Sequence, residues 1–164
     1  MVQQKKFNCK LRKSLLTLVL STGLSAAFAQ VPSDFSGSWL IDNSKSDAAY
    51  KDYKITLTIN QTQQSIKIEE VLTMKDGSKS SMDPLTYTLD GKETKKEEQG
   101  GIDKQSSSWS SDRKTLTLKY VRTVNGSDFG SNTSYTLTPD GRTMTVKTTD
   151  LKGGSATTMV YNKQ

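Results

Sequence analysis

The chain has 164 residues, of which 23 are Lys or Arg and 17 are Asp or Glu, with one cysteine and no histidine. Residues 1–29 hold five of the basic residues, the cysteine and no acidic residue, so the rest of the chain has 18 basic and 17 acidic side chains and a net charge of about +1. This balance excludes the excess of positive charge on which nucleic-acid binding through counterion release depends.

Residues 1–29 have the three parts of a secretory signal peptide. A basic start is followed by the apolar stretch "SLLTLVLSTGLSAAF" and then by "AFAQ", in which Ala27 and Ala29 form an A-x-A-like cleavage site. The apolar stretch is shorter than the ~20 residues that span a bilayer, so a retained membrane anchor is the weaker interpretation. We therefore expect cleavage after Ala29, a location in the periplasm or outside the cell, and no membrane span in the mature domain of residues 30–164.

Beyond the leader, apolar residues recur at every second position, which is the period of a strand with one buried face. "GSWLI" is the first predicted strand, and residues 42–52 form either a polar loop or one helical turn capped by Ser44. The stretch "YKITLTIN", which begins at Tyr53, then alternates regularly. After the turn "NQTQQS" the alternation continues until it slips at "EEVLTM", which predicts a bulge or a strand end.

The second half of the chain repeats this pattern. "LTYTLDGKE" contains a tight Asp-Gly turn, and the charged "ETKKEEQGG" is either a short edge strand or a hairpin tip. Further strands are expected in "GIDKQSSSW", "KTLTLKYVRTV", "SYTL", "RTMTVKTTD" and "ATTMVYNK", with "NGSDFGSN", "TPDGR" and "LKGGS" as turns. Eight to ten strands with short connections predict an all-β fold, a single antiparallel up-and-down β-barrel whose first and last strands pair.

The opening "DFSGSWLIDNSKSD", together with the meander and its repeated "YTLDGKE"-type hairpins, resembles the lipocalin-like barrels of the calycin group, in particular a small secreted bacterial subgroup. The resemblance implies that Gly37 and Trp39 mark the plug at the closed end of the barrel. It also implies that an arginine from a late strand, Arg122 or Arg142, packs against the indole through a cation–π contact. The function implied by the resemblance is binding of a small apolar ligand inside the barrel.

An eight-stranded barrel is just wide enough to be filled by its own side chains or to hold one small ligand. The large apolar residues nearly match the inward positions in number, so a packed barrel that acts through its surface, as an interaction or inhibitor module, stays an open alternative. Aromatic side chains in phase with the buried face favour a pocket, because buried tyrosine hydroxyls need partners. These aromatics are Tyr53, Tyr87, Trp109, Tyr120, Tyr135 and Tyr161, and we expect Tyr87, Trp109, Tyr120 and Tyr135 to line the pocket.

The carboxylates show no pattern typical of catalysis. Glu69 and Glu70 are adjacent, so they point to opposite faces of a strand and cannot form the carboxylate pair of a glycosidase. Glu93, Glu97 and Glu98 alternate with lysines, which is typical of a solvated face. Residues 30–164 also lack cysteine and histidine, which excludes thiol nucleophiles, imidazole bases and their metal sites. We therefore expect a binding protein with no enzyme activity, no metal and no cofactor.

Overall fold

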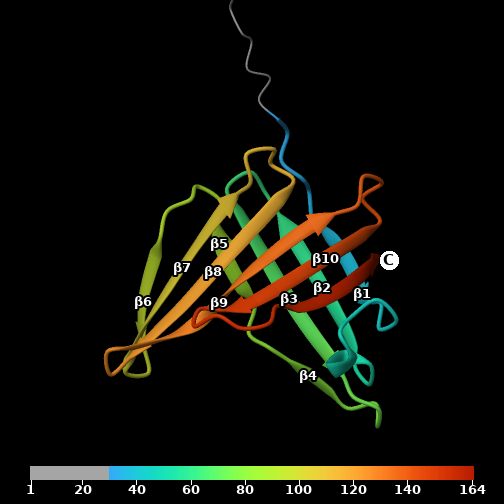
Figure 1. Ribbon diagram of the computed structural model, residues 1–164, viewed down its shortest axis with the longest axis horizontal. Helices are drawn as coiled ribbons and strands as arrows, with labels where there is room; N and C mark the ends of the chain where they lie inside the picture. The colour runs from blue at the N-terminus through green and yellow to red at the C-terminus, as the bar shows by residue number, and fades with distance from the viewer. Residues whose placement is uncertain (1–29) are drawn as a thin grey trace, which may run out of the picture.

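Figure 1 shows a computed structural model of the protein, which describes residues 30–164; the predicted signal peptide lies outside the described residues. The described part contains eleven strands and one turn of 3₁₀ helix. They are β1 (Gly37–Ile41), η1 (Ala48–Tyr50), β2 (Lys54–Gln61), β3 (Ser65–Thr73), β4 (Lys79–Ser81), β5 (Leu85–Thr88), β6 (Thr94–Glu98), β7 (Gly101–Trp109), β8 (Thr115–Val124), β9 (Ser127–Leu137), β10 (Thr143–Asp150) and β11 (Thr157–Lys163).

The strands form one antiparallel sheet that curls on itself (Figure 1). Its order is β4-β3-β2-β1-β11-β10-β9-β8-β7-β6, with β5 paired to β3. β1 pairs with β11, with Trp39 opposite Lys163 and Ile41 opposite Tyr161, so the first and last strands are joined as expected. The prediction of an all-β, antiparallel, up-and-down fold is confirmed, with eleven strands where eight to ten were expected.

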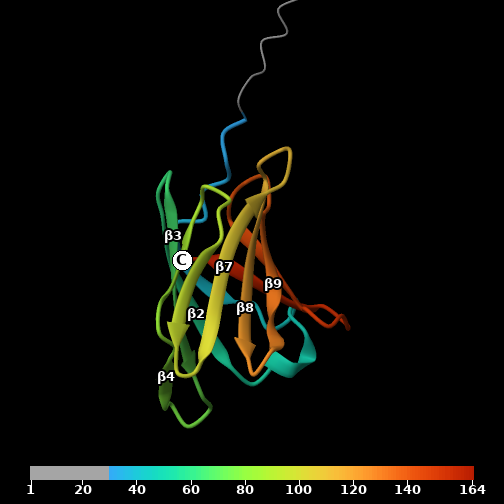
Figure 2. The ribbon, with the colours of Figure 1, turned by 90° about the vertical axis from the view of Figure 1, so that its left-hand side faces the viewer.

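One seam of the barrel has no backbone ladder. Here β5 and β7 contact each other, and the Ser107 hydroxyl on β7 donates a hydrogen bond of 2.6 Å to the Thr88 carbonyl on β5. Figure 2 looks at this side of the molecule. The sheet therefore surrounds an interior, but at this seam a side-chain bond takes the place of strand pairing.

The alternation of residue types decides which side chains face the interior. On β2, Ile55, Leu57 and Ile59 are buried, whereas Lys54 before them and Thr58 between Leu57 and Ile59 are exposed. Burying each of these large apolar side chains stabilises the fold by about 2 kcal/mol. Because directly opposite residues share a face of the sheet, the same phase continues into the neighbouring strands and produces one apolar cluster inside the barrel.

Two expectations about strand continuity had different outcomes. Of the two alternatives at "EEVLTM", a bulge or a strand end, the strand end is the one observed: β3 pairs regularly with β2, with Leu57 opposite Glu70 and Ile55 opposite Leu72, and ends at Thr73. The expectation that "NGSDFGSN" forms a turn was wrong for most of its length, because only Asn125 and Gly126 turn the chain and the rest belongs to β9. There, backbone pairing with a long neighbouring strand outweighs the local composition.

For three shorter stretches the structure decides what the sequence left open or corrects what it predicted. Residues 42–52 do contain a helical turn, but its N-cap is Asp47 and not Ser44, and the Asp47 carboxylate accepts a hydrogen bond of 2.7 Å from the Thr158 backbone on β11. Tyr53 precedes β2 and is 40% exposed, so it does not belong to the buried face. The charged stretch after "LDG" forms the edge strand β6.

Within residues 30–164, no helix combines the length and apolar character needed to cross a membrane.

Candidate ligand-binding site

One end of the barrel is covered by the segment that leads into β1. Its Ser33 amide donates to the Arg113 carbonyl (3.0 Å), and the Gln61 side chain donates to the Ser33 carbonyl (2.9 Å) and accepts from the Phe35 amide (3.1 Å). Phe35 is fully buried, and its ring stacks on Trp109 with centroids 6.1 Å apart. The segment therefore crosses from the end of β2 to the β7–β8 turn, with the Phe35 ring directed into the core.

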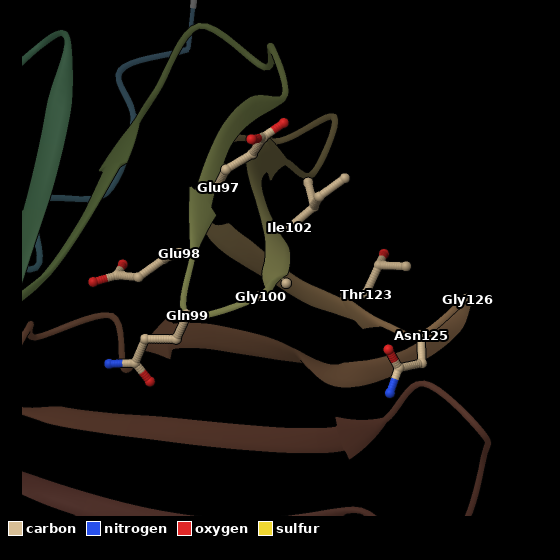
Figure 3. Close-up of a pocket in the computed structure, with 9 residues that line it drawn as sticks. Glu97, Glu98, Gln99, Gly100, Ile102, Thr123, Asn125 and Gly126 are labelled. Carbon is tan, nitrogen blue, oxygen red and sulfur yellow. The ribbon is translucent and has the colours of Figure 1, made fainter.

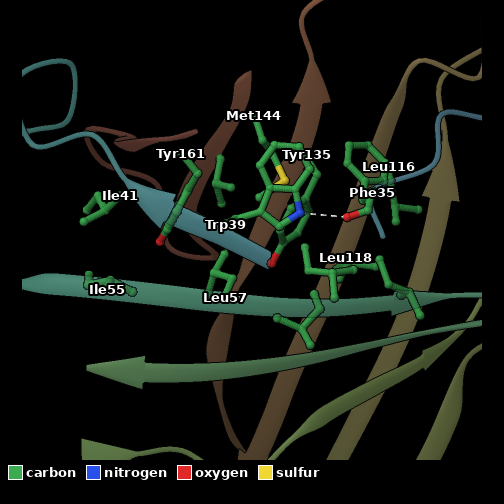
Figure 4. Packing of buried hydrophobic residues seen from close by; sticks show 14 of the residues in the cluster. Phe35, Trp39, Ile41, Ile55, Leu57, Leu116, Leu118, Tyr135, Met144 and Tyr161 are labelled. Carbon is green, nitrogen blue, oxygen red and sulfur yellow. Dashed lines mark hydrogen bonds between the residues drawn. The ribbon is translucent and has the colours of Figure 1, made fainter. Parts of the chain in front are cut away.

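Trp39 lies beside Phe35 and is also fully buried (Figure 4). Its indole Nε1 donates a hydrogen bond of 2.9 Å to the Phe35 carbonyl. The indole therefore fills space at this end and also satisfies a buried carbonyl of the covering segment. Phe35 has an equal part in this closure, and the sequence analysis did not identify it, because its position lies outside the alternating strands.

The cation above Trp39 is a lysine. Lys163 Nζ lies 5.2 Å from the ring centroid, because β1–β11 pairing places Lys163 opposite Trp39. The expectation of Arg122 or Arg142 was wrong: Arg122 is engaged in an ion pair within the β7–β8 sheet. Gly37 (φ +134°) leaves room for the lysine in this position, since a Cβ there would come within 2.9 Å of Lys163 Cε and the flexible end of the lysine would have to shift.

Further from this end, the interior contains a cavity of about 170 Å³. Met82, which is 68% exposed, and Leu85, which is 45% exposed, belong to its wall and mark where it opens. Most of the remaining wall is apolar and comes from strands β2, β3, β9, β10 and β11. The lining residues are Leu57, Ile68, Glu70, Met82, Asp83, Leu85, Thr133, Tyr135, Val146, Thr148, Met159 and Tyr161.

Of the four aromatics expected to line a pocket, Tyr135 is in the wall of this cavity. Trp109 stacks on Phe35 at the covered end, and Tyr87 is buried in the core cluster, where burial raises its pKa to about 12. Tyr120 lies at a separate polar cleft near the seam, and its hydroxyl donates to Asp103 at 3.0 Å. The structure therefore distributes the four residues over different surroundings and does not gather them around one pocket.

The cavity contains three polar groups deep in its wall. Tyr135 is 7% exposed, and no hydrogen bond joins its hydroxyl to the described residues; since none of the fully buried side-chain oxygens among them lacks a partner, this hydroxyl is accessible from the cavity. The Tyr161 hydroxyl donates only to the sulfur of Met159, at 3.3 Å. Glu70 is half-buried on β3, and burial raises its pKa. Burial also raises the pKa values of Tyr135 and Tyr161, with the Glu70 charge contributing to both, so both phenols stay protonated and can donate to a ligand.

Glu70 was dismissed in the sequence analysis together with Glu69. The two do point to opposite faces: Glu69 forms a surface ion pair with Lys67 at 2.6 Å, while Glu70 lines the cavity. A signal for this was present, because Glu70 is in phase with Ile66 and Ile68 and so occupies an inward position of an apolar strand. The predicted slip at "EEVLTM" concealed that phase.

The raised pKa of Glu70 has a measurable consequence for stability. Between the ordinary glutamate pKa and the raised one, the folded state binds more protons than the unfolded state, so the contribution of Glu70 to the free energy of unfolding falls as pH rises through this interval. We expect Glu70→Gln to be more stable than the parent protein at neutral pH and equal to it at pH values below about 3, where the glutamate is neutral in the folded and the unfolded state. Urea unfolding at a series of pH values measures the difference.

Glu69→Gln is the matched control for this measurement, because it removes an exposed carboxylate from the same strand. Exposed ion pairs contribute about 0–1 kcal/mol, so this variant should show little change across the series. A Glu70→Gln variant that is less stable than the parent at neutral pH would contradict the assignment of a desolvated carboxyl to the cavity wall.

A second hollow lies between the β6–β7 turn and the β8–β9 turn (Figure 3). Its walls include Glu97, Glu98, Gln99 and Asn125, all of them in or beside the exposed tips of the hairpins. Walls made of these exposed tips leave a ligand largely in contact with water. Among residues 30–164 no cluster of three or more carboxylate, imidazole or thiol side chains is placed to hold a metal ion. The interior cavity is therefore the candidate site.

Comparison with known proteins gives likenesses among solved structures alone. No protein-family model matches the sequence, and a search of curated proteins finds no match. Among solved structures, the fatty-acid-binding protein isolated from Manduca sexta matches with a TM-score of 0.44 and 11% sequence identity, over 79% of this chain and 99% of that chain. The fold described above rests on the strand register of this chain itself.

Proposed function

We propose that this barrel binds a small, largely apolar molecule in its interior cavity. The observation that carries the proposal is a largely apolar cavity, lined by Leu57, Val146 and Met159, whose wall also holds the Tyr135 hydroxyl, which is unpaired among the described residues and accessible from the cavity. Apolar walls with one free hydrogen-bonding group match a ligand that is largely apolar and carries one polar group. The proposal agrees with the function implied by the resemblance to lipocalin-like barrels.

The volume limits the size of the ligand. At about 170 Å³ the cavity is smaller than the ~300–1,000 Å³ typical of sites for drug-sized ligands and close to the ~150 Å³ that holds one benzene molecule. A single ring or a short alkyl chain with one polar group fits, whereas a long acyl chain would extend past Met82 and Leu85. The leader pattern of residues 1–29 supports the periplasm or the outside of the cell as the place of binding.

Filling the cavity should weaken binding. We expect Thr133→Phe, whose added ring projects into the cavity, to weaken binding of 2-phenylethanol at least about tenfold, because the ring takes the volume that the ligand needs. Binding is followed by methyl-detected NMR, in which the signals of Val146 and Met159 should shift in the parent protein on titration.

Ser134→Phe is the control for the same strand, because Ser134 points to the outer face and is absent from the cavity wall. This variant should bind 2-phenylethanol as the parent protein does. If the parent protein gives no shifts of the cavity methyl groups with 2-phenylethanol, or if both phenylalanine variants bind equally well, the proposed site is wrong.

A further inference from the structure

We propose that the cavity selects ligands with a basic amine and discriminates against carboxylic acids such as short fatty acids. This inference rests on the proposed function and names the chemical class of the ligand. It follows from the charged groups around the cavity: the charged residues in its wall are Glu70 and Asp83, both acidic, and neither lysine nor arginine is present there.

The position of Glu70 places this charge deep in the site. It stands on β3 directly opposite Leu57 and one inward position beyond Ile68, both of which line the same cavity. The Glu70 charge also contributes to the raised pKa values of Tyr135 on β9 and Tyr161 on β11, so the carboxyl and the two phenols share one electrostatic environment. A ligand whose polar end reaches the free Tyr135 hydroxyl therefore comes under the influence of the Glu70 charge.

The carboxyl of Glu70 is itself in need of a partner. Burial is the cause of its raised pKa, and its neighbour Lys67 pairs with Glu69 on the other face of the strand. A ligand ammonium group would offset the desolvation of this carboxyl and provide hydrogen-bond donors to it and to the tyrosine oxygens. A ligand carboxylate would instead add a like charge in a poorly solvated space, which opposes binding.

Asp83 adds a second negative charge at the opening. It lies between Met82 and Leu85, the exposed residues of the wall, and belongs both to the cavity and to the neighbouring polar cleft. A cation that enters past these residues meets Asp83 first and Glu70 further inside. The lysines near the opening, Lys95 and Lys96, belong to the polar cleft and not to the cavity wall.

Three ligands with the same carbon skeleton test the inference on the parent protein. They are 2-phenylethylamine, 2-phenylethanol and phenylacetate, which differ only in the group at the end of the chain. We expect the amine to bind at least about tenfold more tightly than the carboxylate at neutral pH, with the alcohol between them, because the wall offers the carboxylate no cation. Dissociation constants come from methyl-detected NMR titration at fixed ionic strength.

A matched pair of variants then assigns the preference to one residue. Glu70→Gln keeps the shape of the side chain and removes its charge, so we expect the ratio of amine to carboxylate affinity to fall at least about fivefold while the alcohol binds within about twofold of the parent value. Glu69→Gln removes the neighbouring charge on the outer face and should leave all three affinities unchanged.

The outcomes separate this inference from the proposed function. If the alcohol binds in the cavity but phenylacetate binds with less than a tenfold disadvantage to the amine, the choice of amine ligands is wrong and the proposed function stands. If none of the three shifts the methyl signals of Val146 and Met159, the proposed function itself fails. A preference for the amine that survives unchanged in Glu70→Gln also overturns the inference, because the charge would then be recognised elsewhere.

Discussion

Replacing Trp39 with alanine is expected to lower the free energy of unfolding by about 4 kcal/mol. Removing a large buried aromatic ring costs about 3–5 kcal/mol through lost transfer free energy and the cavity left behind. Trp39 is 0% exposed, and the ring is surrounded by Met144, Tyr161 and Phe35, so neighbouring side chains have little freedom to fill the space (Figure 4). Urea unfolding followed by far-ultraviolet circular dichroism measures the loss without relying on the removed indole.

Trp39→Phe separates the volume of the ring from its hydrogen bond. This variant keeps most of the apolar surface but leaves the Phe35 carbonyl without its indole donor, so we expect a loss of about 2 kcal/mol. Lys163→Met keeps the alkyl stem of the lysine above the ring and removes the cation, for which about 0.5–1 kcal/mol is expected at this exposed end of the chain. A Trp39→Ala variant as stable as the parent protein would show that the indole does not hold this end of the barrel.

Replacing Gly130 with alanine is expected to lower the free energy of unfolding by about 3 kcal/mol or more. Gly130 lies on β9 opposite Val121 with φ +147°, and a Cβ built there would come 2.0 Å from the Tyr120 carbonyl oxygen on β8. That oxygen belongs to the backbone, so the clash is relieved only by separating the strands, and the disfavoured φ adds about 1–3 kcal/mol. Urea unfolding and amide hydrogen exchange along β8 and β9 report the effect.

Gly126→Ala is the control for backbone strain alone. Gly126 also has a positive φ, +76°, but a Cβ there would meet no atom within 4 Å. It should therefore cost about 1 kcal/mol, the penalty of a side chain in a left-handed conformation. Equal losses for the two variants would contradict the close approach of β8 and β9 at Gly130.

Much of the fold could be predicted because it depends on local alternation. The phase of Ile55, Leu57 and Ile59 is visible in the sequence, and it is the phase that the barrel buries. Short turns restrict neighbouring strands to antiparallel pairing, which is also a property of adjacent segments. The failure at "NGSDFGSN" occurred where a strand is held by its partner across the sheet and not by its own composition.

The candidate site could be predicted less well, because it is made of residues that are far apart in the sequence. Tyr135 was expected at a pocket and lines the cavity, but Tyr87, Trp109 and Tyr120 share its phase and lie in other surroundings. The alternation along a strand determines that a side chain faces the interior of the barrel. It does not determine how far along the barrel axis the side chain lies or which strand it lies beside. Glu70 was overlooked for a related reason, since its importance comes from the cavity that it faces.

The sequence by itself determined the all-β class, the antiparallel order and the faces of the strands, because these follow from a repeat of two residues and from the length of the connections. Only the tertiary structure decided that Lys163 covers Trp39, that Phe35 closes the end of the barrel, and that Glu70 meets Tyr135 and Tyr161 around one cavity. These contacts depend on the register between distant strands, and register is a property of the sheet as a whole.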